Sequence, residues 1–394
     1  MRHITSGPPA ATLGYCRVVA TPIQIALNLH FVRPGVTGGG ETYAIELVRA
    51  IAALDRRNRY LLLCNRGRGR LDLPDQENFR VISSPVSASV QPFRYAWEQL
   101  VMPAQLRGRG LDLVHSMGYV SPVLAPVKQI VTIPDANWKD LDAMSLTKRR
   151  ILGFFVRRSA AAASVIITGT AAAAATLARH LPADRGRIEV VPLGADHLRM
   201  APLTAGPPEI DRPYLLALSS YSSHKNIPRL LQAFARIAHE VPHTLVIAGH
   251  SNAELRAAVA DIGLGPRIQC TGNVSERTLA SLFAAAELFA FPSWHEGFGL
   301  PLLEAQRYGT PVAASGIPAL IEIANGTAEF FDPFSTESIA SAILRVLKTP
   351  ERRAALAEAA RRNAARYTWE ATARATLEIY AEVAASGRSN SSSR

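Results

Sequence analysis

Cysteine and long apolar segments are both scarce in this sequence. It has three cysteines, Cys16, Cys64 and Cys270, which lie far apart and form no Cys-x-x-Cys pair. A disulfide framework and a cysteine-based metal site are therefore excluded, and a reducing compartment is expected. No run of about 18 apolar residues occurs, and residues 14–17 interrupt the apolar residues near the N-terminus. We expect a cytoplasmic protein whose only membrane contact is peripheral, on the inner face of the plasma membrane.

Acidic residues are also in the minority. The chain carries 43 lysines and arginines against 32 aspartates and glutamates, which gives a formal net charge of +11 at pH 7. A basic surface favours anionic partners, which include nucleic acid, acidic lipid head groups and phosphorylated small molecules. Because the basic residues are dispersed and no nucleic-acid-binding module is recognised, we expect no nucleic-acid partner.

The length and the order of the expected elements indicate two domains. One hydrophobic core rarely grows beyond about 250–300 residues, and this chain has 394. Segments typical of strands alternate with segments of helical period, which is the pattern of parallel sheets covered by helices. Strands are expected at 23–31, 59–64, 111–115, 129–133, 164–168, 188–192, 214–219, 244–248, 267–271, 287–291, 311–314 and 328–331. We predict an α/β fold with two doubly wound domains and a ligand-binding cleft between them.

A stretch rich in proline and glycine divides the chain in two. We interpret it as a linker between two domains, and the tail, rich in serine, as disordered. The predicted parts are a flexible leader 1–22, an N-terminal domain 23–201, a linker 202–213, a C-terminal domain 214–366, a helix 367–386 that packs back on the N-terminal domain, and a disordered tail 387–394.

The densest motif lies at 292–311. A loop with Glu296, Gly297 and Gly299 follows a predicted strand and precedes a predicted helix that contains Glu304. The glycines let backbone N–H groups approach a ligand, and the helix N-terminus favours a phosphate. A phosphate alone would not favour the two flanking carboxylates. The motif therefore indicates a ligand with phosphates in the middle and hydroxyl groups at both ends, which describes a nucleotide sugar.

This motif resembles the Glu-x7-Glu signature of the family 4 retaining glycosyltransferases, which have the GT-B fold. The resemblance runs from about Ile23 to Tyr380 and is most specific in the second half. It includes the glycine loop 38–40 and the segments 191–196, 219–226, 312–333 and 367–370. The resemblance implies two Rossmann-like domains and transfer of a sugar from a nucleotide donor with retained anomeric configuration, without a metal ion or a cofactor.

The resemblance also assigns roles to single residues. Lys225 would neutralise the donor diphosphate, Glu296 would hold hydroxyls of the donor sugar, and Glu304 would accept hydrogen bonds from the ribose. Such a cation aimed at the leaving phosphate is electrostatic catalysis. The remaining donor-binding residues that it implies are Gly39, Gly40, Ser219, Asn226, Gly297, Phe298, Gly299 and Leu300.

One departure concerns a His-Asp pair that many members of the family carry. This sequence has Pro134-Asp135 there, and proline offers no side-chain donor. Asp135, which we take as the third catalytic residue, and His115 are the nearest replacements by position. A second departure is His224 where an arginine is common, which weakens the positive charge at neutral pH.

Several interpretations stay open. The basic segment 148–158 with its apolar middle is either a helix that lies on an anionic membrane or an ordinary helix with solvated charges. The leading function is transfer of a sugar, of the GDP-mannose type, to a glycan or lipid-linked glycan in cell-surface polysaccharide synthesis. The alternatives are a nucleotide-sugar-binding protein with impaired catalysis, which Pro134 favours, and another GT-B enzyme such as a sugar epimerase or phosphorylase. Nothing in the sequence indicates an oligomeric state.

Overall fold

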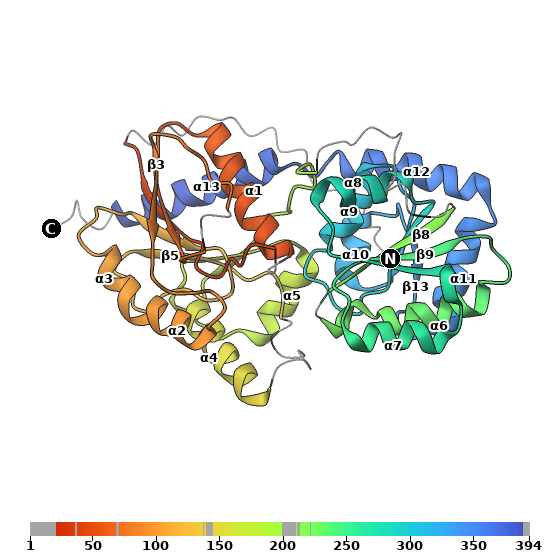
Figure 1. Ribbon diagram of the computed structural model, residues 1–394. Helices are drawn as coiled ribbons and strands as arrows, with labels where there is room; N and C mark the ends of the chain where they lie inside the picture. The colour runs from red at the N-terminus through yellow and green to blue at the C-terminus, as the bar shows by residue number, and fades with distance from the viewer. Residues whose placement is uncertain are drawn as a thin grey trace.

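The computed structural model describes residues 21–35, 38–67, 71–136, 138, 145–198, 210, 213–220 and 222–388. Residues 1–20 of the predicted leader, most of the predicted linker 202–213 and residues 389–394 of the predicted tail lie outside the described residues. Figure 1 shows two α/β lobes side by side, the first coloured red to yellow-green and the second green to blue.

The first lobe is built on a sheet of seven parallel strands in the order β3-β2-β1-β4-β5-β6-β7. The strands are β1 (Gln24–Asn28), β2 (Arg59–Cys64), β3 (Phe79–Ser83), β4 (Leu113–Ser116), β5 (Lys128–Thr132), β6 (Val165–Thr168) and β7 (Arg187–Val190). The helices are α1 (Gly39–Leu54), α2 (Gln91–Ala96), the π-helical turn η2 (Trp97–Val101), α3 (Met102–Leu106), α4 (Leu146–Ala162) and α5 (Ala171–His180). Alternate side chains of β1 enter different cores, because Ile25 and Leu27 pack with α1 while Ala26 packs with α3.

The second lobe is built on six parallel strands in the order β10-β9-β8-β11-β12-β13. The strands are β8 (Tyr214–Ser219), β9 (Thr244–Gly249), β10 (Ile268–Gly272), β11 (Leu288–Phe291), β12 (Val312–Ser315) and β13 (Glu329–Phe331). The helices are the 3₁₀ turns η4 (Ser223–Lys225) and η5 (Gly265–Arg267) and α6 (Ile227–Ile237), α7 (Ala253–Ile262), α8 (Glu276–Ala285), α9 (Leu300–Arg307), α10 (Pro318–Ala324), α11 (Thr336–Leu347) and α12 (Pro350–Ala364). The predicted fold class, α/β with two doubly wound parallel sheets, is confirmed.

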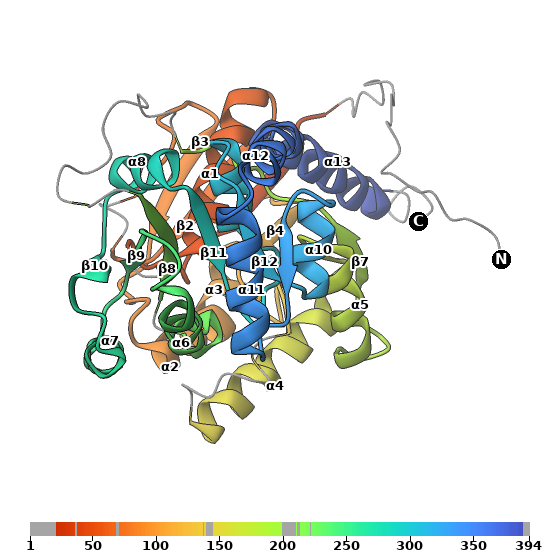
Figure 2. The same ribbon diagram turned by 90° about the vertical axis from the view of Figure 1, so that its right-hand side faces the viewer.

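The last helix, α13 (Trp369–Arg388), follows the second lobe in sequence but packs on the first. Its residues Trp369, Ala373 and Tyr380 are buried in the same core as the inner face of α1. Figures 1 and 2 show α12 on the second lobe and α13 extending from it along the first. The chain therefore crosses between the lobes twice, once before β8 and once between α12 and α13.

Candidate functional site

The loop after β11 lies directly against the first lobe at Gly297. A Cβ atom built on Gly297 would lie 2.3 Å from the carbonyl oxygen of Pro134 and 2.9 Å from Cβ of Asp135. No side chain fits at such distances, so glycine is required for this close approach. The hydroxyl of Thr170 donates to the Gly297 carbonyl oxygen at 2.8 Å and accepts from the backbone N–H of Ala173 at 3.0 Å, which caps α5. The loop backbone is thus fixed between the two sheets.

The same loop ends at Gly299, which begins α9. Gly299 has φ 98° and ψ 43°, a left-handed conformation that favours glycine, and a Cβ atom there would lie 2.3 Å from Cδ2 of Leu320. The side chains of Phe298 and Leu300 are buried in the core of the second lobe. What these residues can offer a ligand is therefore backbone, together with the N-terminal N–H groups of α9.

Two of the three predicted catalytic residues form an ion pair. Lys225 ends the turn η4, and its Nζ lies 2.7 Å from Oε1 of Glu296 and 5.1 Å from the ring centre of Phe291. The side chains of Lys225 and Glu296 are only 16% and 13% exposed. Burial raises the pKa of Glu296, but the charge of Lys225 and the hydrogen bond that it donates to the carboxylate outweigh this effect and hold the pKa below its ordinary value. Glu296 is therefore ionised at neutral pH, and Lys225 balances its charge.

The residues that flank Lys225 have different functions. Burial lowers the pKa of His224 to about 4, so its imidazole is neutral at pH 7 and adds no positive charge beside Lys225. Asn226 is left-handed, with φ 56°, and its amide donates to the carbonyl oxygens of Pro292 at 3.0 Å and Pro333 at 2.8 Å. The Asn226 side chain therefore joins three loops and fixes the turn that carries Lys225.

Asp135 lies in the first lobe, against the Gly297 loop of the second lobe. It has a partner that was not expected from the sequence. The hydroxyl of Tyr119 donates to Oδ1 of Asp135 at 2.6 Å. Burial raises the pKa of Tyr119, and the negative charges of Asp135 and Glu296 raise it further. Tyr119 also has a positive φ of 34°, which is strained for a non-glycine residue. Its place after the carboxyl end of β4 was the only signal that could have indicated it.

Glu304, on α9, is held by a second residue that sequence reasoning missed. Nε2 of His197 lies 3.0 Å from Oε1 of Glu304, with side chains 5% and 8% exposed. The indole N–H of Trp369 faces Nδ1 of His197 at 3.3 Å, so Nδ1 accepts and Nε2 carries the hydrogen that Glu304 receives. Burial lowers the pKa of His197, but its hydrogen bond to Glu304 and the negative charge of that carboxylate outweigh burial and raise the pKa. The signal was present, because His197 directly follows the motif segment 191–196.

His115 does not replace the missing histidine. It is fully buried, and its ring nitrogens lie 2.7 Å from the hydroxyl of Tyr380 and 2.8 Å from that of Thr132. Burial lowers its pKa to about 3, so it stays neutral. Both nitrogens are used in the core under α13, so of the two interpretations of His115 left open, a functional and a structural histidine, the contacts favour the structural one.

A cavity of about 410 Å³ opens between the lobes. Gly35 and Gly38 line it from the first lobe, and Ser219 and His250 line it from the second. Ser219, at the carboxyl end of β8, donates to the carbonyl oxygen of His250 at 2.7 Å. The predicted residues Gly39 and Gly40 form the first turn of α1 next to Gly38, and a Cβ atom on Gly39 would meet open space.

A buried polar cluster lies at the carboxyl ends of β1 and β4. The side chain of Asn28 donates to Ser116 and contacts His30. Glu98, in the π-helical turn η2, is 2% exposed, and burial raises its pKa to about 7 although Arg94 opposes the shift. Glu98 was not expected from the sequence, because it lies in none of the motifs.

The described ranges contain no group of three or more histidine, cysteine, aspartate or glutamate side chains that could hold a metal ion. Within the same ranges, none of the helices combines the length and the apolar character needed to cross a membrane.

Two family models match consecutive parts of the chain. Glycosyltransferase Family 4 matches residues 37–199, and Glycosyl transferases group 1 matches residues 206–363. The boundary between them falls where the structure passes from β7 to β8.

Curated relatives match about half of the chain. An MMP alpha-(1->4)-mannosyltransferase of Mycolicibacterium hassiacum is 28% identical over 49% of this chain and 48% of its own length. A D-inositol 3-phosphate glycosyltransferase of Rhodococcus jostii is 32% identical over 52% of this chain and 49% of its own. The O-antigen chain mannosyltransferase B of Escherichia coli is 29% identical over 50% and 55%. The chain thus spans about half the length of the curated relatives it matches.

Solved structures match over almost the whole chain. Sucrose-phosphate synthase from Thermosynechococcus elongatus has a TM-score of 0.74 at 21% identity and covers 92% of this chain and 100% of its own. HepE of Anabaena has a TM-score of 0.68 at 18% identity, with 91% and 100% covered. At such identities the likeness is one of fold. Each lobe also matches one of the two family models, and the chain therefore belongs to the GT-B glycosyltransferases of family 4 and group 1.

Proposed function

We propose that this protein transfers a sugar from a nucleotide-diphosphate donor to a hydroxyl group of an acceptor. The observation that carries the proposal is the pair of carboxylates around the start of α9. Glu296 lies before the helix and contacts Lys225, and Glu304 lies inside the helix and contacts His197. A nucleotide sugar has hydroxyl groups at both ends and phosphates between them, which matches this order of groups.

The chemistry of the step is charge stabilisation on the leaving group. As the bond between the sugar and the diphosphate breaks, negative charge grows on the phosphate, and Lys225 with the N–H groups of α9 would stabilise it. Glu296 would hold sugar hydroxyls, and Oε2 of Glu304, which makes no hydrogen bond among the described residues, would accept from the ribose. We propose that the anomeric configuration is retained and that no metal ion takes part.

The donor and acceptor are proposed from relatives. Two of the curated relatives are mannosyltransferases, one of them acting on an O-antigen chain, which supports a GDP-mannose type of donor and a glycan or lipid-linked glycan acceptor in cell-surface polysaccharide synthesis. Other relatives are inositol-phosphate glycosyltransferases, and HepE was solved with UDP and glucose. A panel of donors must therefore include both guanosine and uridine nucleotides.

We also propose a cytoplasmic location with peripheral membrane contact through 148–158. On α4, Gly153, Val156 and Ala160 face the core, whereas Ile151 and Phe154 are 45% and 57% exposed. Arginines 150, 157 and 158 are exposed on the same helix. Apolar side chains among cations fit an anionic bilayer surface.

A second candidate function is donor binding without transfer. Pro134 favours it, because this position has no side-chain donor near the sugar site. A third is another GT-B reaction, epimerisation or phosphorolysis, in which the same donor groups bind a nucleotide sugar or a sugar phosphate.

The test combines binding with product analysis. Thermal shift against nucleoside diphosphates and their sugars identifies the donor, because a ligand bound only by the native state raises the melting temperature. Incubation of that donor with a glycan-lipid extract should then give a product with the donor's anomeric configuration. Binding without donor consumption would support the second candidate, and free sugar phosphate or an epimerised donor the third.

A further inference from the structure

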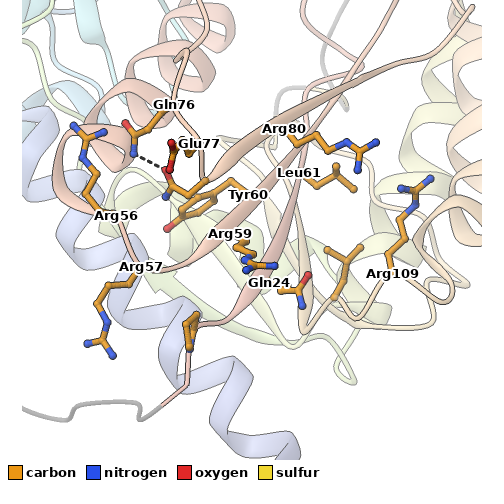
Figure 3. Close-up of a pocket in the computed structure, with 13 residues that line it drawn as sticks. Gln24, Arg56, Arg57, Arg59, Tyr60, Leu61, Gln76, Glu77, Arg80 and Arg109 are labelled. Carbon is orange, nitrogen blue, oxygen red and sulfur yellow. Dashed lines mark hydrogen bonds between the residues drawn. The ribbon is translucent and has the colours of Figure 1, made fainter.

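A second groove lies on the first lobe, away from the cleft. It has a volume of about 890 Å³ and is open to solvent at the amino ends of β1 and β2 (Figure 3). Parallel strands of five or six residues separate their two ends by roughly 15–20 Å. The loops with Gly35 and Gly38 lie at the other, carboxyl end of the same sheet. The groove is therefore a different place from the proposed donor site.

The groove is strongly cationic. Five arginines line it, Arg56, Arg57, Arg59, Arg80 and Arg109, against one acidic residue, Glu77. All five are exposed, and none forms an ion pair within the part of the chain that the structure describes.

Several arginines in other parts of the protein are neutralised by a glutamate. Arg187, Arg345, Arg352 and Arg353 each pair with a glutamate of a different element. The groove arginines thus have no acidic partner among the described residues. Their charges repel one another, and a bound anion would relieve this repulsion.

The nearby carboxylate of Asp55 does not neutralise these arginines. It accepts hydrogen bonds from the hydroxyl of Tyr60 and the amide of Asn58, both at 2.6 Å. The amide of Asn78 in turn donates to the backbone carbonyl oxygens of Asp55 at 3.1 Å and Asn58 at 2.9 Å. These hydrogen bonds fix the floor of the groove. The Asp55 carboxylate is bonded to Tyr60 and Asn58 and not to the side chains of the arginines.

The arrangement suits an extended ligand. In Figure 3, Arg56 and Arg57 lie at one end of the groove, Arg80 and Arg109 at the other, and Arg59 between them. Guanidinium groups bind phosphate and carboxylate oxygens as paired donors. The side-chain amide of Gln24 lies between the arginines and makes no hydrogen bond to the described residues, so it can serve hydroxyl groups.

We propose that this groove binds an acidic glycan, with its phosphate or carboxylate groups on the arginines and its hydroxyls on the side-chain amide of Gln24. A concave floor below the arginines fits a chain better than it fits a flat bilayer. The inference goes beyond the proposed transfer reaction, because it assigns a second site for the charged part of a polysaccharide and does not depend on which donor the cleft binds.

The test compares two triple variants of the full chain that lose the same charge. Arg59→Gln/Arg80→Gln/Arg109→Gln removes cations of the groove, and the control Arg236→Gln/Arg256→Gln/Arg366→Gln removes exposed cations of the second lobe. Inorganic tripolyphosphate, an oligogalacturonate and a neutral dextran are titrated against each variant at physiological ionic strength, and vesicles with phosphatidylglycerol are added in a separate arm. Nucleoside diphosphate binding in the cleft is measured on the same samples.

We expect the groove variant to bind the anionic probes roughly tenfold more weakly or worse, while the control binds like the wild type. The dextran should not bind. The affinities for tripolyphosphate and oligogalacturonate show whether the groove prefers phosphate or carboxylate. Equal binding by groove variant and wild type, or no binding of either anionic probe to the wild type, overturns the proposal. Binding of vesicles alone, lost in the groove variant, replaces the glycan with a lipid surface. If the wild type binds no nucleoside diphosphate, the proposed function is refuted and the proposal for the groove is not affected.

Discussion

Replacement of Lys225 by alanine tests the centre of the proposed mechanism. Its Nζ lies 2.7 Å from Oε1 of Glu296, in the loop that leads to α9, and the N-terminus of α9 would face the leaving phosphate. Removal of one oriented donor from a developing oxyanion costs about 3–4 kcal/mol, which is roughly 10²–10³ in rate. We expect Lys225→Ala to lower turnover by that factor.

The same substitution also affects stability, because it leaves the Glu296 carboxylate without its cation. Breaking a fully buried pair costs about 3–5 kcal/mol. Both side chains keep some exposure, 16% and 13%, so solvent screens part of that cost, and we expect about 1–3 kcal/mol. The double variant Lys225→Met/Glu296→Gln has no orphaned charge. It should regain stability and stay inactive.

The assay follows release of nucleoside diphosphate from GDP-mannose and UDP-glucose with a glycan-lipid extract, and urea unfolding is measured on the same proteins. Lys348→Ala is the matched control, since it removes an exposed lysine of the same lobe that pairs with Glu240. Near-normal turnover in Lys225→Ala would remove this lysine from the mechanism. If the double variant recovers turnover together with stability, the loss was structural and the electrostatic argument is wrong.

Further predictions concern both sides of the cleft. Glu304→Ala should weaken the binding of both nucleoside diphosphate and nucleotide sugar, whereas Glu296→Ala should weaken only the binding of the nucleotide sugar. Calorimetry with both ligands measures this, and the opposite pattern would mean that the two roles are exchanged. Asp135→Ala should lower transfer; equal transfer by variant and wild type excludes a catalytic part. The raised pKa of Glu98, about 7, predicts stability that is complete below pH 4.5 and is lost as pH rises to about 7, by about 3 kcal/mol. Glu98→Gln should remove that loss in unfolding curves at pH 4.5 and pH 8, and unchanged pH dependence contradicts it. Gly297→Ala places a Cβ atom 2.3 Å from a backbone oxygen, so it should weaken donor binding at unchanged secondary structure, measured by calorimetry and circular dichroism.

The sequence predicted the architecture because buried parallel strands are continuous apolar runs. β1, β2 and β8 have almost entirely buried residues and were expected at nearly the observed positions. β3 was missed. It is an edge strand with only Phe79 buried, so it has no apolar run that could be recognised in the sequence.

The site was predictable where a residue lies inside a local motif. Lys225, Glu296 and Glu304 were expected from their own segments, and the structure brings the first two together across 71 residues of chain. Tyr119 and His197 were not expected, because each acts on a residue from a different segment. A contact such as His197 to Glu304 depends on the packing of α9 against the chain between the lobes, which no local pattern encodes.

The geometry at Pro134 bears on whether the protein is an enzyme. The carbonyl oxygen of Pro134 would meet a Cβ atom on Gly297 at 2.3 Å, so the backbone of Pro134, independent of its side chain, lies directly against the loop that carries Glu296. A histidine there could add a donor toward the sugar, whereas the diphosphate, in the proposed mechanism, would bind to Lys225 and the start of α9. Tyr119 supplies a hydroxyl in the same region, where it is bound to Asp135 at 2.6 Å. The proposed stabilisation of the leaving group does not need a histidine at this position, and we expect Pro134→His to change the affinity for the sugar donor more than the rate of transfer.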